Sequence, residues 1–238
     1  MVEYANLTHG SRSLIKRFSH GVRYKKYCDF LRISETDSTR SFLDYGTGDG
    51  YIFNIISDNG IYGFDLHGYE PIEDQYRQFV DNVSKNGLDV GCHKSLDENK
   101  KYDVIICAEV LEHFTAVDVQ YHLEKLKDLL SPSGRLLISV PMEIGIAGFA
   151  KNIVRKVIGE THTGLSPSAI FKSLFDMPIY RSKGGYISSH VGFSYKKLEY
   201  LIVDQGFKIE RKYFSPIPIF RGLLNSQVFF ELSALPNK

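Results

Sequence analysis

Hydrophobic residues along this chain fall into short runs that alternate with amphipathic segments. Seven apolar runs have the length of strands, at residues 41–45, 61–65, 90–93, 104–108, 135–140, 207–214 and 227–232. Four segments have helical spacing, at residues 51–56, 70–86, 116–130 and 195–205. Alternation of this kind predicts an α/β fold, with a mainly parallel sheet and helices on both of its faces. The last two strands are separated only by a proline-containing loop, so we expect them to pair antiparallel.

Two segments interrupt the alternation. Residues 11–33 are basic and aromatic with near-helical spacing, which predicts helices packed over the ligand site. Within residues 143–188, the stretch 144–158 reads as an amphipathic basic helix, 169–175 as a short helix and 180–186 as a glycine-rich loop. We therefore divide the chain into four parts: an N-terminal helical cap (1–40), a ligand-binding core (41–142), a helical lid insertion (143–188) and the remainder of the sheet (189–238).

The first predicted strand ends in an acid and is followed by glycine at every second position. The sequence is Asp44-Tyr45-Gly46-Thr47-Gly48-Asp49-Gly50, and a predicted helix begins at Tyr51. Glycines let a ligand approach the backbone closely, and a carboxylate accepts hydrogen bonds from a cation. A dinucleotide fingerprint is G-x-G-x-x-G, and an acid beside the loop repels phosphate. The loop thus suits a ligand with an amino acid end, although an ordinary strand-to-helix turn also has such glycines.

A second acid, Asp65, ends the predicted strand 61–65. It follows Asp44 by about twenty residues, the separation expected for the ribose-binding acid of a nucleotide-binding βαβ unit. A helix cap or turn aspartate is the alternative.

These motifs resemble those of the class I S-adenosylmethionine-dependent methyltransferases. Asp44-x-Gly46-x-Gly48-x-Gly50 and Gly63-Phe64-Asp65 resemble the first two strand ends of the family. Later segments follow in the same order: the fourth strand and following helix (101–114), the fifth strand with its turn (129–141) and a His-Val-x-Phe segment before the last helix (189–194). Ser133 stands where the family's turn often has a second glycine. The resemblance implies a Rossmann-like seven-stranded sheet and S-adenosylmethionine as cofactor, with S-adenosylhomocysteine as product.

The resemblance also implies which residues bind the cofactor. Asp44 and the glycine loop would hold its amino acid end, and Asp65 its ribose. The full set comprises Asp44, Tyr45, Gly46, Gly48, Gly50, Asp65, Leu66, Ser95, Leu96, Cys107, Ala108 and Glu109. Ser95 and Leu96 could equally form a plain surface loop, and Glu109 could simply favour a helix start.

Transfer to an oxygen acceptor profits from a general base, and histidine suits this role near neutral pH. The candidates are His113, His162 and His190, each of which could instead be structural or solvated. Glu109 and His113 have the spacing of half a metal site, but no second ligand pair follows, so we expect no metal.

The acceptor is expected to be a small molecule bound by residues 143–188. We expect O-methylation of a sugar, nucleotide-sugar or lipid-linked saccharide, with a quinone or other lipid-like acceptor as the alternative. The basic helix at 144–158 could pack on the core or contact a membrane or lipid-linked acceptor. Two rival functions are a non-catalytic S-adenosylmethionine-binding scaffold and an NAD-dependent enzyme, and the glycine spacing argues against the second.

Bulk properties fit one α/β domain with additions. The chain has 238 residues, 43% of them hydrophobic, and a formal net charge of +1, which does not favour a nucleic acid partner. Cys28, Cys92 and Cys107 show no disulfide or zinc spacing, which indicates a reducing compartment. With no signal-like apolar core near Met1 and no run of bilayer length, we expect a cytoplasmic protein.

Overall fold

A computed structural model of the chain describes residues 14–34, 38–143, 167–175, 177, 187, 192–216 and 225–235. The expected helix at 144–158 and the expected loop at 180–186 lie outside these residues, as do His162 and His190.

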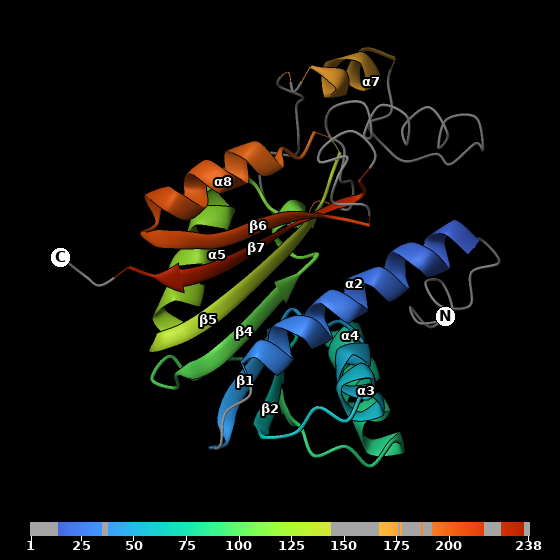
Figure 1. Cartoon of the computed structure of the whole chain (residues 1–238), viewed down its shortest axis with the longest axis vertical. Helices are drawn as coiled ribbons and strands as arrows, with labels where there is room; N and C mark the ends of the chain where they lie inside the picture. Colours follow the sequence, from blue (N-terminus) through green and yellow to red (C-terminus); the bar gives the residue numbers. More distant parts are fainter. Residues whose placement is uncertain are drawn as a thin grey trace. The chain divides into compact units, whose positions relative to one another are not determined.

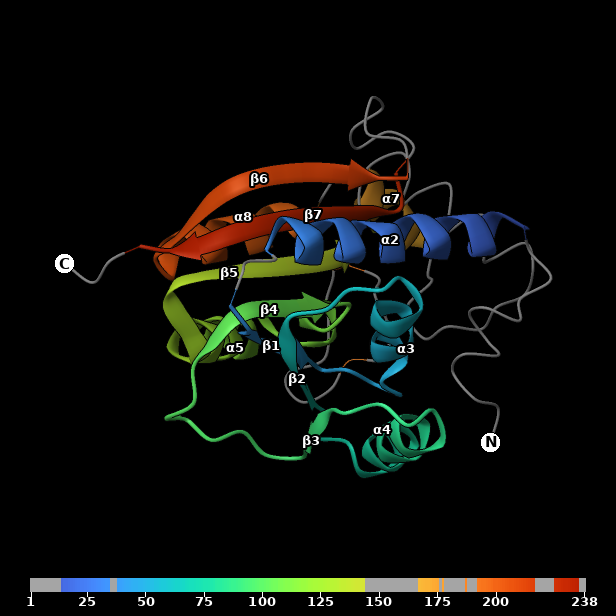
Figure 2. The ribbon, with the colours of Figure 1, turned by 60° about the horizontal axis from the view of Figure 1, so that its bottom comes forward.

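Seven strands form one sheet in the order β3-β2-β1-β4-β5-β7-β6 (Figures 1 and 2). Their bounds are β1 Arg40–Tyr45, β2 Phe64–Tyr69, β3 Gly91–His93, β4 Tyr102–Ala108, β5 Leu130–Pro141, β6 Phe207–Ser215 and β7 Gln227–Ala234. β1 pairs in parallel with β2 and β4, and β2 pairs in parallel with β3. β6 and β7 pair antiparallel. The fold class expected from the alternation is therefore confirmed.

The helices fall close to their expected positions. They are α2 Leu14–Ile33, α3 Tyr51–Asp58, α4 Glu73–Lys85, the short 3-10 helix η1 Leu111–His113, α5 Ala116–Leu129, α7 Pro167–Leu174 and α8 Tyr195–Asp204. No helix in the described part of the chain is both long and apolar enough to span a bilayer.

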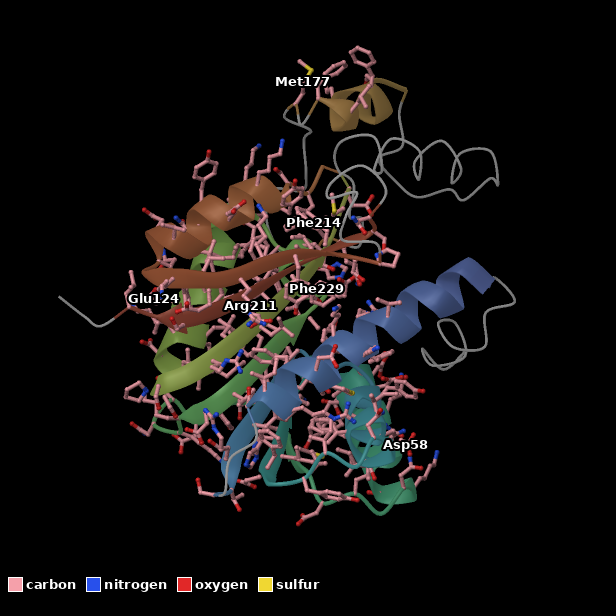
Figure 3. All side chains as sticks on the ribbon, viewed as in Figure 1. Asp58, Glu124, Met177, Arg211, Phe214 and Phe229 are labelled. Atoms are coloured by element: carbon pink, nitrogen blue, oxygen red, sulfur yellow. The ribbon has the colours of Figure 1, made fainter. Side chains whose placement is uncertain are left out.

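The chain divides into two compact units. Residues 1–108, 126–137 and 236–238 form the first unit, which contains the glycine loop; residues 109–125 and 138–235 form the second. In the first unit the rings of Phe42, Phe53 and Phe79 are buried, and Phe53 stacks on Phe79 with ring centroids 5.5 Å apart. In the second unit Phe229 of β7, labelled in Figure 3, stacks on Tyr213 of β6 with ring centroids 5.1 Å apart. In the described part of the chain, Cys28, Cys92 and Cys107 form no disulfide, and Cys107 is fully buried, as expected of a core residue.

The second strand differs from its expected position. β2 spans Phe64–Tyr69, so the expected strand 61–65 is wrong by several residues. Ile61 instead belongs to the end of α3: its N–H donates to the carbonyl of Ile56 (3.2 Å), and Gly60 has a left-handed φ of 60°. This is the common glycine-terminated helix end, in which an apolar residue packs back on the helix. β2 itself carries His67 and Gly68, which hide its strand character from an apolar count.

Candidate functional site

The glycine loop takes a conformation that other residues rarely adopt. Gly46, Gly48 and Gly50 have φ values of 80°, 62° and 72°. A Cβ atom on Gly50 would lie 2.3 Å from Cδ2 of Phe79, whereas a Cβ on Gly48 would meet nothing nearer than 4.0 Å. Gly50 is therefore required by packing as well as by backbone angle, and Gly48 leaves room above the loop.

Hydrogen bonds fix this loop to the carboxyl end of β2. The N–H groups of Gly46 and Thr47 both donate to the carbonyl of Tyr69, at 2.8 and 3.0 Å. The Gly48 N–H donates to Oε2 of Glu70 at 2.9 Å. Tyr45 pairs with Tyr69, and Tyr69 with His93, so β1, β2 and β3 end at the same level of the sheet. Ligands of open α/β sheets bind at this edge.

Asp44 lies at the end of β1 and is only 5% exposed. Burial raises the pKa of its carboxyl to about 7, and the carboxylates of Glu70 and Asp49 act in the same direction. A cation placed beside Asp44 would offset this cost, because an opposite charge favours the ionised form. The site therefore fits a ligand with an ammonium group.

Glu70 is a second buried acid at the same edge, 3% exposed. Its Oε2 accepts from Gly48 N–H and its Oε1 from Ile72 N–H (2.9 Å). Burial raises the pKa of this carboxyl. Glu70 was not expected from the sequence, because the expected second strand ends at Asp65, four residues before the end of β2. The signal was present in the sequence as the acid after the Phe64–Tyr69 run.

Asp65 does not lie at this edge. It is the second residue of β2 and pairs with Ser41 near the start of β1, and its side chain is 59% exposed. Its Oδ2 is 2.8 Å from Nε2 of His67. Leu66 pairs with Phe42, again within the strand. The expectation that Asp65 ends its strand is therefore wrong, because the strand continues four residues beyond Asp65. The contact of Leu66 with adenosine, which the family resemblance implies, stays a prediction.

The remaining core candidates do follow strand ends. Ser95 and Leu96 lie just after β3, and Cys107 and Ala108 are the last residues of β4. The Cys107 side chain is fully buried, so only its backbone can face a ligand. Glu109, in the second unit, has a φ of 56°, and its Oε1 accepts from Nε2 of Gln227 at 3.1 Å.

One aromatic pair joins helix α2 to the glycine loop within the first unit. The ring of Tyr24 meets that of Tyr51, the residue directly after the loop, with centroids 5.5 Å apart. The adjacent Arg23 is 7% exposed and lies 5.6 Å from the Tyr24 ring. Tyr24 belongs to the aromatic segment 11–33, which the sequence predicts to form helices over this site.

His113 is the one catalytic candidate among the residues that the structure describes. It ends η1, its Nδ1 lies 2.8 Å from the carbonyl of Ile187, and its carbonyl accepts from Ile187 N–H at 2.8 Å. Its Nε2 is 4.0 Å from Oε1 of the buried Glu112. Within the described ranges, no three His, Cys, Asp or Glu side chains are placed to hold a metal ion.

Comparisons with known proteins agree with this geometry. A family model described as a methyltransferase domain matches residues 18–152. The ubiquinone biosynthesis O-methyltransferase of Rickettsia conorii is 26% identical over 163 residues, 63% of this chain and 55% of the relative. Its Rickettsia prowazekii counterpart is 24% identical over 184 residues, 72% of this chain and 71% of the relative. The chain thus spans little more than half of the R. conorii relative.

Solved structures show the same fold at low identity. Magnesium protoporphyrin IX methyltransferase from Synechocystis, with bound S-adenosylhomocysteine, has a TM-score of 0.59 at 14% identity, covering 95% of this chain and 90% of that one. An S-adenosylmethionine-dependent methyltransferase from Clostridium acetobutylicum has a TM-score of 0.60 at 11% identity, covering 97% and 96%. With the glycine loop and its two buried acids, the domain match shows that this chain belongs to the S-adenosylmethionine-dependent methyltransferases.

Proposed function

We propose that the chain transfers a methyl group from S-adenosylmethionine to an oxygen of a small-molecule acceptor. The observation that carries this proposal is the pair of buried acids beside the glycine loop, Asp44 and Glu70, at 5% and 3% exposure. Two acids suit a ligand with an ammonium group and free hydroxyls, and they disfavour a pyrophosphate.

Each part of this site has a distinct task. Asp44 binds the ammonium group, and the left-handed glycines let the ligand lie against the backbone. Glu70, anchored by Gly48 and Ile72, accepts hydrogen bonds from the ribose hydroxyls in place of Asp65. Arg23 is a candidate for the ligand's carboxylate, because its neighbour Tyr24 contacts the residue after the loop. When bound, the cofactor supplies an electrophilic sulfonium methyl, and the chain supplies alignment.

His113 is our candidate for the general base. If Nδ1 donates to the carbonyl of Ile187, the neutral ring keeps a lone pair on Nε2, where a proton can be accepted. The Glu112 carboxylate 4.0 Å from Nε2 favours the charged ring that results. General base catalysis contributes on the order of 10²–10⁴ in rate. The His113→Gln variant should therefore lose turnover and keep cofactor affinity.

A quinone-like phenol is the acceptor class we favour over a saccharide. The support is the name of the Rickettsia relatives, ubiquinone biosynthesis O-methyltransferase. The saccharide expectation rested on residues 143–188, where the structure describes chiefly α7. The side chains of Phe171 and Phe175 are 58% and 61% exposed there, with ring centroids 5.2 Å apart, and aromatic surface suits a lipid-like acceptor as well as a sugar.

A methyl-transfer assay distinguishes these functions. Purified protein receives S-adenosylmethionine labelled in its methyl group with a catechol bearing a short isoprenoid chain, with a nucleotide-sugar, or with no acceptor. We expect label in the catechol product and none with the nucleotide-sugar. Label in the nucleotide-sugar alone would restore the saccharide acceptor, and cofactor binding without transfer to any acceptor would favour the scaffold function.

A further inference from the structure

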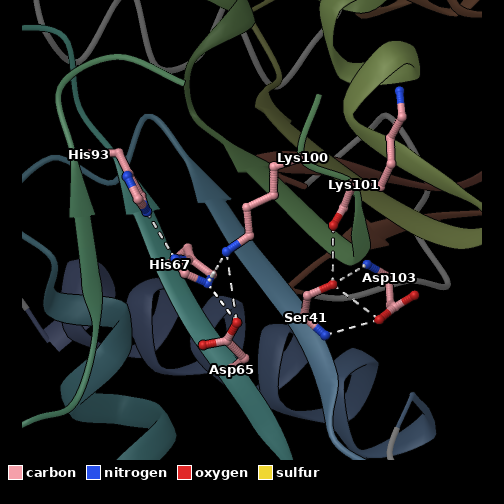
Figure 4. Close-up of polar contacts among 7 residues, drawn as sticks. All are labelled: Ser41, Asp65, His67, His93, Lys100, Lys101 and Asp103. Atoms are coloured by element: carbon pink, nitrogen blue, oxygen red, sulfur yellow. Dashed lines mark hydrogen bonds and ion pairs between the residues drawn. The ribbon is translucent and has the colours of Figure 1, made fainter. Parts of the chain in front are cut away.

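A cluster of charged side chains lies on β2 away from the two acids, and the proposed function assigns it no task. His67, 8% exposed, is at its centre (Figure 4). Its Nδ1 is 2.9 Å from Nε2 of His93, and its Nε2 is 2.8 Å from Oδ2 of Asp65 and 2.7 Å from Nζ of Lys100. Tyr102 of β4 also contacts His67, and the centroids of the two rings are 5.5 Å apart.

The fold makes room for this cluster by omitting a side chain. Gly91 of β3 pairs with His67 in the sheet. A Cβ atom on Gly91 would lie 2.3 Å from Nδ1 of His67 and 3.0 Å from Nε2 of His93. Because Gly91 does not have a positive φ, the space taken by the two rings, not the backbone angle, requires glycine here.

Two of the polar partners of His67, His93 and Lys100, flank the segment 94–99, which contains Ser95 and Leu96. His93 is the last residue of β3, directly before the segment, and Lys100 follows it. His93 is also tied to the proposed ribose site, because its carbonyl accepts from Glu70 N–H at 3.0 Å. Glu70 in turn accepts from Gly48 N–H in the glycine loop.

We propose that His67 is a positioning residue for the cofactor site, which holds both ends of segment 94–99 and thereby sets how this loop meets the ligand. This inference rests on the proposed function. His67 lies within the strand, so it acts through His93 and Lys100, not by touching the cofactor.

The two ring nitrogens of His67 have different partners. A lysine ammonium only donates and a carboxylate only accepts, so Nε2 cannot serve Lys100 and Asp65 at once. In the neutral ring, Nδ1–H donates to His93 and Nε2 accepts from Lys100, so both ends of segment 94–99 are held.

The pKa shifts of two groups beside the His67 ring agree with this hydrogen-bond pattern. Burial lowers the pKa of His93, with the charges of His67 and Lys100 acting the same way, which keeps His93 a neutral partner. The hydrogen bond to His67 lowers the pKa of Asp65, which keeps that carboxylate ionised. Lys100 also lies 3.8 Å from Asp65, so its ammonium has a counter-charge beside the His67 ring.

Three variants test the proposal. Gly91→Ala displaces the His67 ring without changing any charge, and His67→Asn removes the ring. Lys100→Met removes the second tie together with the ion pair to Asp65, from a side chain that is 34% exposed. Gly21→Ala is the matched control, since a Cβ there meets nothing within 4 Å. In ligand-free protein at constant pH, the backbone amide resonances of Ser95 and Leu96 should shift in all three variants relative to wild type, because at least one tie of segment 94–99 is lost. The control should keep the wild-type resonances.

Affinity provides the second measurement. At pH 8 the three variants should bind S-adenosylhomocysteine about tenfold more weakly than wild type, with kcat at saturation little changed. Folded variants, judged by circular dichroism, that keep wild-type affinity would overturn the proposal, as would Ser95 and Leu96 resonances that do not change in the variants. Should Gly91→Ala fail to fold, Lys100→Met decides. Wild-type protein that binds no S-adenosylhomocysteine refutes the proposed function instead, and the resonances of the ligand-free variants still test the role of His67.

Discussion

Asp44 destabilises the ligand-free protein at neutral pH. Its pKa is about 7 in the fold against an ordinary value of 3.8, so the unfolded chain ionises first as pH rises. The stability from this group is present below about pH 4 and is lost as pH rises towards 7. We predict that Asp44→Asn narrows the difference in unfolding free energy between pH 5 and pH 8 by roughly 2–3 kcal/mol. Urea titrations of both proteins measure this, and parallel pH profiles would contradict it.

Glu70, and not Asp65, is the proposed acceptor for the ribose hydroxyls. Glu70→Gln keeps the size of the side chain and removes its charge, so cofactor binding should weaken by roughly 1–3 kcal/mol. Asp74→Asn, on an exposed side chain in the first turn of α4, is the control and should bind as wild type. Equal affinities of the two variants in calorimetry would remove Glu70 from the site.

At the scale of elements, two glycines of one loop have different tasks. Gly50→Ala forces a Cβ against the Phe79 ring and a side chain into left-handed backbone, whereas Gly48→Ala meets only the second problem. Gly48→Ala should lower the free energy of unfolding by roughly 1 kcal/mol, and Gly50→Ala should lower it by about 1–3 kcal/mol more. Gly48→Ala should chiefly weaken cofactor binding. Thermal melts and titrations of both variants check this order, and equal melting temperatures would contradict it.

Local patterns predicted most elements but misplaced one strand. The Asp44 to Gly50 loop, the antiparallel last pair and the short helix at α7 could be read from glycine spacing and apolar periodicity. β2 could not, because Ile61 is an apolar residue that caps α3 and His67 is a polar residue buried by its partners. The His67 cluster depends on register with Gly91, which no local window contains. His113 was found as a candidate, but its contact with Ile187 joins residues far apart in sequence.

For the whole molecule, acceptor binding and cofactor binding should be separable. The acids and glycines of the cofactor site all lie in the first unit, outside residues 143–188. Deleting residues 145–185 should therefore preserve affinity for S-adenosylhomocysteine and abolish methyl transfer. Transfer at the wild-type rate by the folded, shortened protein would show that these residues do not bind the acceptor.

The proposed cofactor has an ammonium group, which binds beside Asp44, and no phosphate. Calorimetric titration with S-adenosylhomocysteine at pH 8 and pH 6 tests this most directly, with NAD as the competing ligand. We predict binding at pH 8 that weakens about tenfold by pH 6, as Asp44 gains its proton, a large loss in Asp44→Asn, and no heat with NAD. Heat with NAD but none with S-adenosylhomocysteine, or an affinity that ignores both pH and the Asp44→Asn substitution, would contradict it.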